Sequence, residues 1–457
     1  MLDEPKLREL IRKYSIAGPR YTSYPTAPQW NEAHGRDAYQ AQLHAKVMGE
    51  NEPVALYIHI PFCEKLCYYC GCNIQITKDH DRSPSYVDAL LSEARSVVGF
   101  LGKRELSQIS WGGGTPTFLS CDEIRRLHQG IVDCFGVAAE AEVSIEVDPR
   151  VTSDEQLQCL RDLGFNRVSM GVQDFDPKVQ KAINREQSRE LTQAMLQRCR
   201  SLGYTGINFD LIYGLPHQSL GSFEQTVDAV VEIRPDRIAL YNYARLPSLL
   251  KHQGILEEYP MPSPEERVDI FTMAYDRLTA VGYHAIGMDH FALAEDELYQ
   301  AIKRGTLYRN FMGYTVKRGK HMIGLGASAI GEIGPSYFQN LRKPQDYQAA
   351  VESGQLAAFR GCLLSGDDQR RKWVIQELMC RFELSYSTFE TEFGDRFESY
   401  FARELPALPG FASDGILELT PRMIRVTPLG RLFVRNVAMV FDAYLQQPKA
   451  ATYSKTV

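Results

Sequence analysis

The chain has 457 residues, with 44% apolar residues, 24% charged residues and a formal net charge of −6. This length exceeds what one small core needs and predicts two domains, or one large domain with appendages. The composition is that of an ordinary globular protein. The negative charge argues against a protein whose main partner is nucleic acid or an anionic membrane.

The cysteines indicate a reducing compartment. Four of the ten lie between residues 63 and 72, and the other six are scattered singly along the chain. Scattered thiols at apolar positions are typical of cytoplasmic proteins and not of a disulfide framework. The charged first residues carry no apolar core of a secretory signal, and no apolar run reaches about 18 residues. We therefore expect a cytoplasmic protein with no membrane span.

Residues 1–50 predict a short helix and an extended arm. Residues 4–14 have a helix-like pattern, and residues 19–28 contain three prolines and two tyrosines without any period. Such a segment favours extended backbone. Either it is a surface tail, or it is an arm that folds over a site.

From residue 54 onwards, apolar strand-like runs alternate with segments of helical period. The expected strands cover residues 54–60, 107–111, 142–147, 167–172, 206–213 and 237–243. The expected helices cover residues 86–101, 122–135, 153–163, 177–202, 222–233 and 264–281, with Ser153 and Ser222 at N-cap positions. Six strand–helix units predict an α/β fold with a parallel sheet, either a partial barrel or an open doubly wound sheet.

The carboxyl ends of these six strands are polar or rich in glycine. In chain order they carry the cysteine loop, then Gly112–Thr115, Glu146 with Asp148 and Arg150, Gln173, Asp210, and Tyr241–Arg245. Because ligands of parallel α/β folds bind at this edge, the six strand ends predict one shared site.

Beyond the barrel, the character of the sequence changes near residue 365. Helices are expected at 370–382, 386–393 and 429–444, with a hairpin at 417–426. We therefore divide the chain into an N-terminal helix and arm (1–50), a barrel with an extension (51–350) and a mostly helical, winged-helix-like domain (360–457). The acidic residues of the last domain speak against DNA binding, so we expect it to pack against the barrel.

The cysteine loop has the chemistry of a metal or cluster site. Cys63, Cys67 and Cys70 are separated by three and then two residues, and Cys72 is too near to be an easy fourth ligand. Three soft thiolates suit zinc or an iron–sulfur cluster. Structural zinc needs a fourth ligand, whereas three thiolates on a four-iron cluster leave one iron open. The spacing alone leaves three alternatives open, namely zinc, an iron–sulfur cluster and thiols that bind no metal.

This spacing resembles the signature of radical S-adenosylmethionine enzymes, and the six β/α units resemble their partial (β/α)6 barrel. In that family, three cysteines hold a 4Fe-4S cluster whose open iron binds the methionine moiety of S-adenosylmethionine. Reductive cleavage then gives a 5′-deoxyadenosyl radical. The resemblance therefore implies that Cys63, Cys67 and Cys70 are the cluster ligands.

The match is closer to one family within this superfamily, the oxygen-independent coproporphyrinogen III oxidases (dehydrogenases). The segments that carry this resemblance are 21–27, 57–63, 70–73, 111–117, 144–150, 170–175, 184–185 and 209–216. The resemblance implies oxidative decarboxylation of two propionates of coproporphyrinogen III to vinyl groups, giving protoporphyrinogen IX in haem biosynthesis. The alternative is a haem chaperone of similar fold without decarboxylase activity.

The resemblance also implies binding of two S-adenosylmethionine molecules. The residues it assigns to the first are Tyr57, Gly113, Glu146 and Ile330, and those it assigns to the second are Tyr69, Gly114, Thr115, Gln173, Arg185, Asp210 and Ala244. His59 and Cys72 are the candidate catalytic residues. Arg20 and Arg245 are candidate partners of the propionates. Met312 replaces the Gln that the family pattern predicts, and Tyr69 replaces the commoner Phe.

The implied partners are the substrate coproporphyrinogen III, a reducing electron donor protein and an electron acceptor that the resemblance does not identify. We expect a monomer that binds no nucleic acid.

Overall fold

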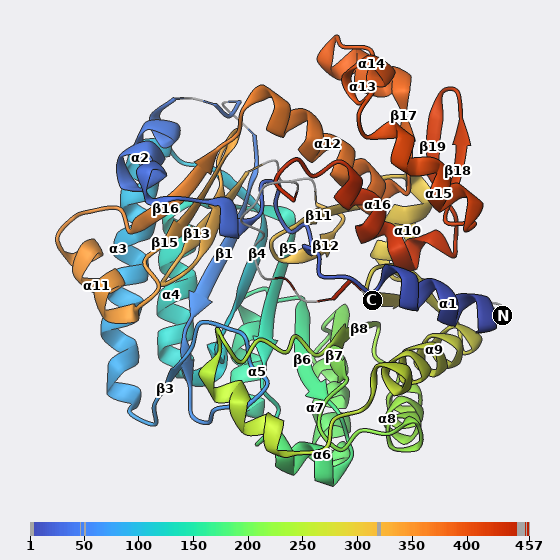
Figure 1. Cartoon of the computed structure of the whole chain (residues 1–457). Coiled ribbons are helices and arrows are strands. Elements are labelled where there is room, and N and C mark those ends of the chain that lie inside the picture. Colours follow the sequence, from blue (N-terminus) through green and yellow to red (C-terminus); the bar gives the residue numbers. More distant parts are fainter. Residues whose placement is uncertain are drawn as a thin grey trace.

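A twelve-stranded sheet forms the centre of the molecule (Figure 1). The computed structural model describes residues 4–45, 47–49, 52–317, 321–445, 453, 455 and 456. The parallel strands are β13 (Met322–Leu325), β1 (Val54–Ile60), β4 (Glu105–Gly113), β5 (Gly136–Val147), β6 (Arg167–Gln173), β7 (Gly206–Tyr213) and β8 (Arg237–Asn242), in this order across the sheet. The predicted partial barrel is therefore confirmed, and β13 extends it beyond β1.

Antiparallel strands extend both edges of this parallel part. On one side lie β10 (His290–Leu293) and β9 (Tyr283–Gly287), and on the other β14 (Ile330–Glu332), β15 (Ser336–Asn340) and β16 (Ala358–Leu363). A separate hairpin of β11 (Tyr308–Asn310) and β12 (Gly313–Thr315) lies near the arm. Among the helices of the described ranges, none combines the length and apolar content that crossing a bilayer requires.

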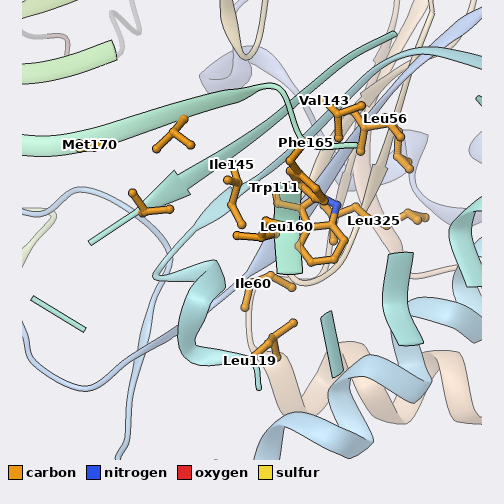
Figure 2. Packing of buried hydrophobic residues seen from close by; sticks show 14 of the residues in the cluster. Leu56, Ile60, Trp111, Leu119, Val143, Ile145, Leu160, Phe165, Met170 and Leu325 are labelled. Carbon is orange, nitrogen blue, oxygen red and sulfur yellow. The ribbon is translucent and has the colours of Figure 1, made fainter. Parts of the chain in front are cut away.

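Helices on the outer face of the sheet bury its apolar side chains. They include α3 (Ser83–Leu101), α4 (Cys121–Cys134), α5 (Asp154–Asp162), α8 (Leu220–Ile233) and α9 (Pro264–Ala280). Trp111 is fully buried and packs edge-on against Phe165, 5.2 Å between ring centroids, close to Leu160 (Figure 2). Truncating a buried aromatic residue of this kind costs about 3–5 kcal/mol of stability. The rigid sheet fixes the strand ends at which the site is built.

The N-cap at Ser153 is confirmed, but the N-cap at Ser222 is wrong. The side chain of Ser153 accepts a hydrogen bond from the backbone N–H of Gln156, as an N-cap residue does. Helix α8 begins earlier, with Ser219 as its N-cap and Ser222 as the third residue of a capping box. Both serines can fill these roles, so the sequence pattern places the helix start only within one turn.

The single helix predicted over 177–202 is also wrong. The chain forms α6 (Pro177–Ala182) and α7 (Arg189–Ser201), separated by Asn184 in a left-handed conformation with φ of 58°. Asn tolerates this conformation better than most residues. The Asn184 side chain donates to the Leu66 carbonyl of the cysteine loop at 2.7 Å. The break therefore brings the next residue, Arg185, to the site.

A second apolar cluster joins the two ends of the chain. It unites α1 (Glu4–Tyr14) with α12 (Gly366–Arg381), α13 (Tyr386–Phe393), α16 (Val434–Val440) and the small sheet of β17 (Glu383–Ser385), β19 (Met423–Val426) and β18 (Leu417–Thr420). Figure 1 shows α1 between α9 and these C-terminal elements. The helix expected over 429–444 is shorter, a 3-10 turn (Gly430–Phe433) followed by α16. The domain limits proposed from the sequence stay a prediction.

The arm is buried and is not a surface tail. Tyr24 is 1% exposed and Trp30 is 5% exposed. The Tyr21 hydroxyl donates to Asp442 at 2.9 Å, and the Tyr24 hydroxyl accepts from the Ala443 amide. The arm therefore runs between the barrel and the C-terminal region.

Candidate functional site

A cavity of about 660 Å³ opens at the carboxyl ends of β1, β4, β5, β6 and β7. Twelve of the predicted site residues line it. They are Cys63, Cys67, Cys70, Cys72, Tyr69, Gly113, Gly114, Thr115, Glu146, Gln173, Arg185 and Asp210. The fold thus brings together strand ends that are up to about 150 residues apart in the sequence.

The cysteine loop places its three candidate ligands on one wall of this cavity. Cys63 Sγ lies 3.4 Å from Thr115 Oγ1, and Cys70 Sγ accepts from the Cys72 amide at 3.4 Å. Hydrogen bonding from the Cys72 side chain lowers the pKa of Cys70 to about 7 and raises that of Cys72. This favours the thiolate, which is the metal-binding form, at Cys70 rather than Cys72.

The glycine loop after β4 lets the backbone approach the cysteine loop closely. The Gly114 amide donates to the Ile60 carbonyl at 2.8 Å, and the Thr115 amide donates to the Phe62 carbonyl at 2.8 Å. A Cβ at Gly114 would lie 2.6 Å from the Phe62 carbonyl oxygen. Side chains at this position would therefore push the two loops apart.

Two carboxyl groups at strand ends face the cavity, and neither forms an ion pair among the described residues. The Glu146 carboxylate accepts from the Gly113 amide at 3.2 Å, and Asp210 accepts from Asn208 and Ser169 at 2.9 and 3.1 Å. Burial, and next the charge of Asp210, raise the pKa of Glu146 to about 7. Burial raises the pKa of Asp210 to about 6. Ammonium or hydroxyl donors from a ligand would stabilise both ionised groups.

Two arginines surround Cys67 and share one carboxylate. Arg150 and Arg185 donate to Cys67 Sγ at 3.6 and 3.8 Å and pair with Asp148 at 2.6 and 3.1 Å. Burial opposes ionisation of Asp148, but Arg185 and Arg150 outweigh it and lower its pKa to about 2. The sequence places Asp148 and Arg150 at a strand end but assigns them no contact. Their position directly after β5 is the sequence feature that could have indicated a role in the site.

Gln173 combines backbone strain with an unsatisfied polar atom. Its φ is 66°, and the pairing of β6 with β7 shifts register at this residue. The side chain is 6% exposed, and its Oε1 is buried without a hydrogen-bond partner. A non-glycine residue with positive φ at a strand end often marks a functional site. Neither feature can be read from the sequence.

His59 lies beneath the glycine loop and not on the cavity wall. Its Nε2 donates to the Asn73 carbonyl at 2.8 Å and its Nδ1 accepts from the Tyr57 hydroxyl at 3.1 Å. Burial lowers the pKa of His59 to about 4, so its ring is neutral at pH 7. A Cβ at Gly113 would meet this ring at 2.5 Å. The catalytic role of His59 stays a prediction.

The remaining predicted residues lie outside the cavity lining. Gln253 links the carbonyls of Ala244 and Tyr69 through its side-chain amide. Ile330 lies on β14, beside Gly324 of β13, whose register partner is Tyr57. Arg245 is 53% exposed and pairs with Glu257, and its role toward a propionate stays a prediction. Met312 lines a second cavity inside the barrel.

The donor set fits an iron–sulfur cluster better than a single zinc ion. The three thiols share a cavity with two guanidinium groups, which would balance the negative charge of thiolate ligands. Within the part of the chain that the structure describes, no three His, Cys, Asp or Glu side chains close around one metal ion.

Comparisons with known proteins agree with this geometry. Residues 57–230 match the model of the radical SAM superfamily, and residues 364–433 match the HemN C-terminal domain. The oxygen-independent coproporphyrinogen III oxidase of Pseudomonas aeruginosa is 45% identical, over 98% of both chains. That of Escherichia coli is 44% identical, over 96% of this chain and 95% of that protein.

A solved structure extends the likeness to the fold. The structure described as coproporphyrinogen III oxidase (HemN) from Escherichia coli, a radical SAM enzyme, superposes with a TM-score of 0.89 at 44% identity. It covers 93% of this chain and 98% of that chain. The likeness includes the barrel and the C-terminal region, so a haem chaperone is not favoured. The chain belongs to the oxygen-independent coproporphyrinogen III oxidase family of radical S-adenosylmethionine enzymes.

Proposed function

We propose that the chain converts coproporphyrinogen III to protoporphyrinogen IX by oxidative decarboxylation of two propionate side chains to vinyl groups. The observation that carries this function is the meeting of Cys63, Cys67 and Cys70 in one cavity with the polar strand ends, in a chain that matches its relatives over nearly its whole length. When bound, the 4Fe-4S cluster supplies the electron that cleaves S-adenosylmethionine to the 5′-deoxyadenosyl radical.

The residues of this chain bind and shield the reactants. Cys63, Cys67 and Cys70 hold the cluster, and the two arginines beside Cys67 balance its charge. The Glu146 carboxylate, next to the glycine loop, would accept hydrogen bonds from the first S-adenosylmethionine. The strand ends that line the cavity would limit the access of water to a reaction there.

A second S-adenosylmethionine is the finer part of the proposal. Arg185 can clamp a carboxylate, Asp210 can accept from ribose hydroxyls, and the free oxygen of Gln173 can accept from an amino group. These three residues come from other elements than Glu146 and would form a separate wall. Their polarity supports two cofactor molecules in one cavity.

The proposal includes a reducing electron donor protein, an electron acceptor and a monomeric state in the cytoplasm. Ten free cysteines support a reducing compartment.

Anaerobic reconstitution with iron and sulfide, followed by S-adenosylmethionine, a reductant and coproporphyrinogen III, tests this function. We expect the singly and then the doubly decarboxylated product. Cofactor binding without either product would contradict the oxidase function and favour the chaperone. Colourless protein that holds stoichiometric zinc would contradict both.

A further inference from the structure

Three arginine side chains lie close together where the arm, the β11–β12 hairpin and the C-terminal region adjoin one another. The guanidinium carbon of Arg20 lies 5.2 Å from the centre of the Tyr241 ring, and that of Arg309 lies 5.4 Å from the centre of the Tyr314 ring. Arg435 lies beside them and lines a small cavity together with Arg20. We call these three side chains the arginine cluster.

The arginine cluster carries more positive charge than its surroundings balance. Asp289 pairs with Arg20, but no ion pair to a carboxylate is found for Arg309 or Arg435 among the described residues. Both of these side chains are buried, at 6% and 3% exposure, and Arg309 Nε has no hydrogen-bond partner. Burial, and then the charges of Arg20 and Arg309, lower the pKa of Arg435 to about 9. An anion placed here would stabilise the cluster.

The backbone contacts of the cluster assign different tasks to its members. Arg435 donates through Nε to the Pro19 carbonyl at 3.0 Å and through Nη1 to the Thr456 carbonyl at 3.1 Å, and it also binds the Gly18 carbonyl. Its hydrogen-bonding capacity is thus used to hold the arm. Among the described residues, Arg309 donates only to the Arg20 carbonyl, at 2.8 Å. Arg20 and Arg309 therefore keep donors for a ligand.

Two rings that the cluster contacts, those of Tyr241 and Tyr314, line a cavity that adjoins the cofactor cavity. This barrel cavity, of about 180 Å³, is lined by Tyr241, His290 and Tyr314, and it shares Tyr241 and Asp210 with the cofactor cavity. Burial, and then the charges of Arg309 and Arg20, lower the pKa of His290 to about 3. Its ring is therefore neutral, and the positive charge at this wall comes from the guanidinium groups.

The two arginines that line the barrel cavity itself are already neutralised. Arg167 pairs with Glu142 at 3.0 Å, and Arg237 pairs with Asp296 at 2.8 Å. Their charges are therefore not available to a further anion. Next to this cavity, Arg309 over the Tyr314 ring has no carboxylate partner among the described residues, whereas Arg20 pairs with Asp289.

We propose that Arg20 and Arg309 bind a carboxylate of the substrate, and that Arg435 positions Arg20 by holding the arm backbone. The inference rests on the proposed function, because it assigns the site to one propionate of the tetracarboxylate substrate. Guanidinium groups recognise carboxylates by paired hydrogen bonds, which a neutral ester does not accept equally well. A substrate anchored beside Tyr241 lies at the entrance that the two cavities share.

The test compares two stable porphyrins, coproporphyrin III and its tetramethyl ester, by quenching of their fluorescence on the reconstituted enzyme. The variants are Arg20→Gln, Arg309→Gln and Arg309→Lys. The control is Arg277→Gln, which removes an exposed arginine that pairs with Asp228 on the outer helices. We expect the wild type and the control to prefer the acid over the ester.

In Arg20→Gln and Arg309→Gln, affinity for the acid should fall roughly ten-fold or more, with little change for the ester. Arg309→Lys keeps the charge and should recover part of the affinity. A variant that only misfolds would lose both ligands, so the acid-to-ester ratio separates binding from structure. KM for coproporphyrinogen III should rise more than kcat falls.

An unchanged acid-to-ester ratio in both Gln variants, with an active wild type, would overturn this inference and leave the proposed function intact. A wild-type enzyme that prefers the acid but forms no decarboxylated product would support the carboxylate site and contradict the proposed function instead. The two failures are therefore distinguishable.

Discussion

Glu146 and Asp210 are acids whose environment disfavours their own charge. Both lie at strand ends that line the cavity, both have raised pKa values, and neither forms an ion pair among the described residues. The nearby Asp148 has the opposite character, because Arg150 and Arg185 hold it ionised. Groups of strongly shifted pKa that share one cavity are typical of ligand and active sites. Glu146 and Asp210 therefore have the character of ligand-binding groups, whereas Asp148 already has its cationic partners.

Replacing Asp210 with Asn should weaken S-adenosylmethionine binding about ten-fold while iron content stays unchanged. The amide keeps the shape but loses an acceptor for ligand hydroxyl or amino groups. Equilibrium binding and iron analysis measure the two effects. Asp228→Asn, at an exposed ion pair on α8, is the control. Loss of iron from Asp210→Asn would mean that Asp210 supports the cluster rather than the cofactor.

Gly113→Ala should destabilise the protein by about 1–3 kcal/mol and lower S-adenosylmethionine affinity. Its φ is 113°, and the added Cβ would lie 2.5 Å from the His59 ring. Gly164→Ala is a matched control, because its φ of 93° is equally unsuited to Ala but nothing lies within 4 Å of the new Cβ. Urea unfolding compares the two. Equal losses of stability would show that the His59 contact does not matter.

At the scale of elements, one buried carboxylate connects four of them. Glu93 on α3 accepts hydrogen bonds from the Gly326 amide after β13, from Asn340 of β15 and from Tyr347 of α11 (Pro344–Glu352), at 2.9, 2.7 and 2.7 Å. It is 2% exposed, and burial raises its pKa to about 7. Glu93 is therefore a titratable group through which α3 binds three elements of the barrel extension.

The stability that Glu93 contributes should depend on pH. Its folded-state pKa is raised, so the folded protein holds a proton that the unfolded chain releases from about pH 4.5 upwards. The contribution is thus largest below this range and is lost as pH rises to about 7, by up to about 3 kcal/mol. Urea unfolding between pH 5 and 8 measures it against Glu93→Gln. Parallel pH curves for the two proteins would contradict the assignment.

The sequence predicts the bounds of an element well where one apolar period covers it. It predicts them poorly where the backbone conformation of a single residue ends the element. The ranges of β1 and β7 agree with the prediction to the residue, because their apolar runs are bounded by clear breaks. The apolar period of 177–202 continues through Asn184, whose left-handed conformation depends on its bond to Leu66. The residues that line the cavity were predicted from the polar strand ends and from the resemblance to the family. Of the arginine cluster, the sequence analysis names Arg20 alone, because its members lie at positions 20, 309 and 435 and no sequence pattern connects them.

At the scale of the whole molecule, the arm is held by elements from both ends of the chain. Trp30 stacks on Tyr337 of β15 with ring centroids 5.3 Å apart, and its indole nitrogen donates to the Pro25 carbonyl at 3.1 Å. Tyr14 stacks on Phe411 of the C-terminal region at 5.1 Å. The N-terminal segment therefore contacts both the barrel extension and the C-terminal region.

Trp30→Ala should loosen the arm without disturbing the cluster. Loss of a buried indole costs about 3–5 kcal/mol locally, so trypsin should cleave after Arg20 faster than in the wild type, and KM for the substrate should rise. Trp30→Phe, which keeps a stacking ring, should restore most of the protection. Iron content should stay unchanged. Slow cleavage after Arg20 in Trp30→Ala would show that other contacts are enough to hold the arm.

The hydrogen bonds from Arg435 to the carbonyls of Gly18 and Pro19 have a consequence for the order of events during synthesis. The arm leaves the ribosome among the first residues, but the side chain that holds it emerges more than 400 residues later. The barrel and its cysteine loop are synthesised by then, so the contacts of Arg435 with the arm form last. The backbone beside Arg20 therefore gains these hydrogen bonds only after the last helix has been made.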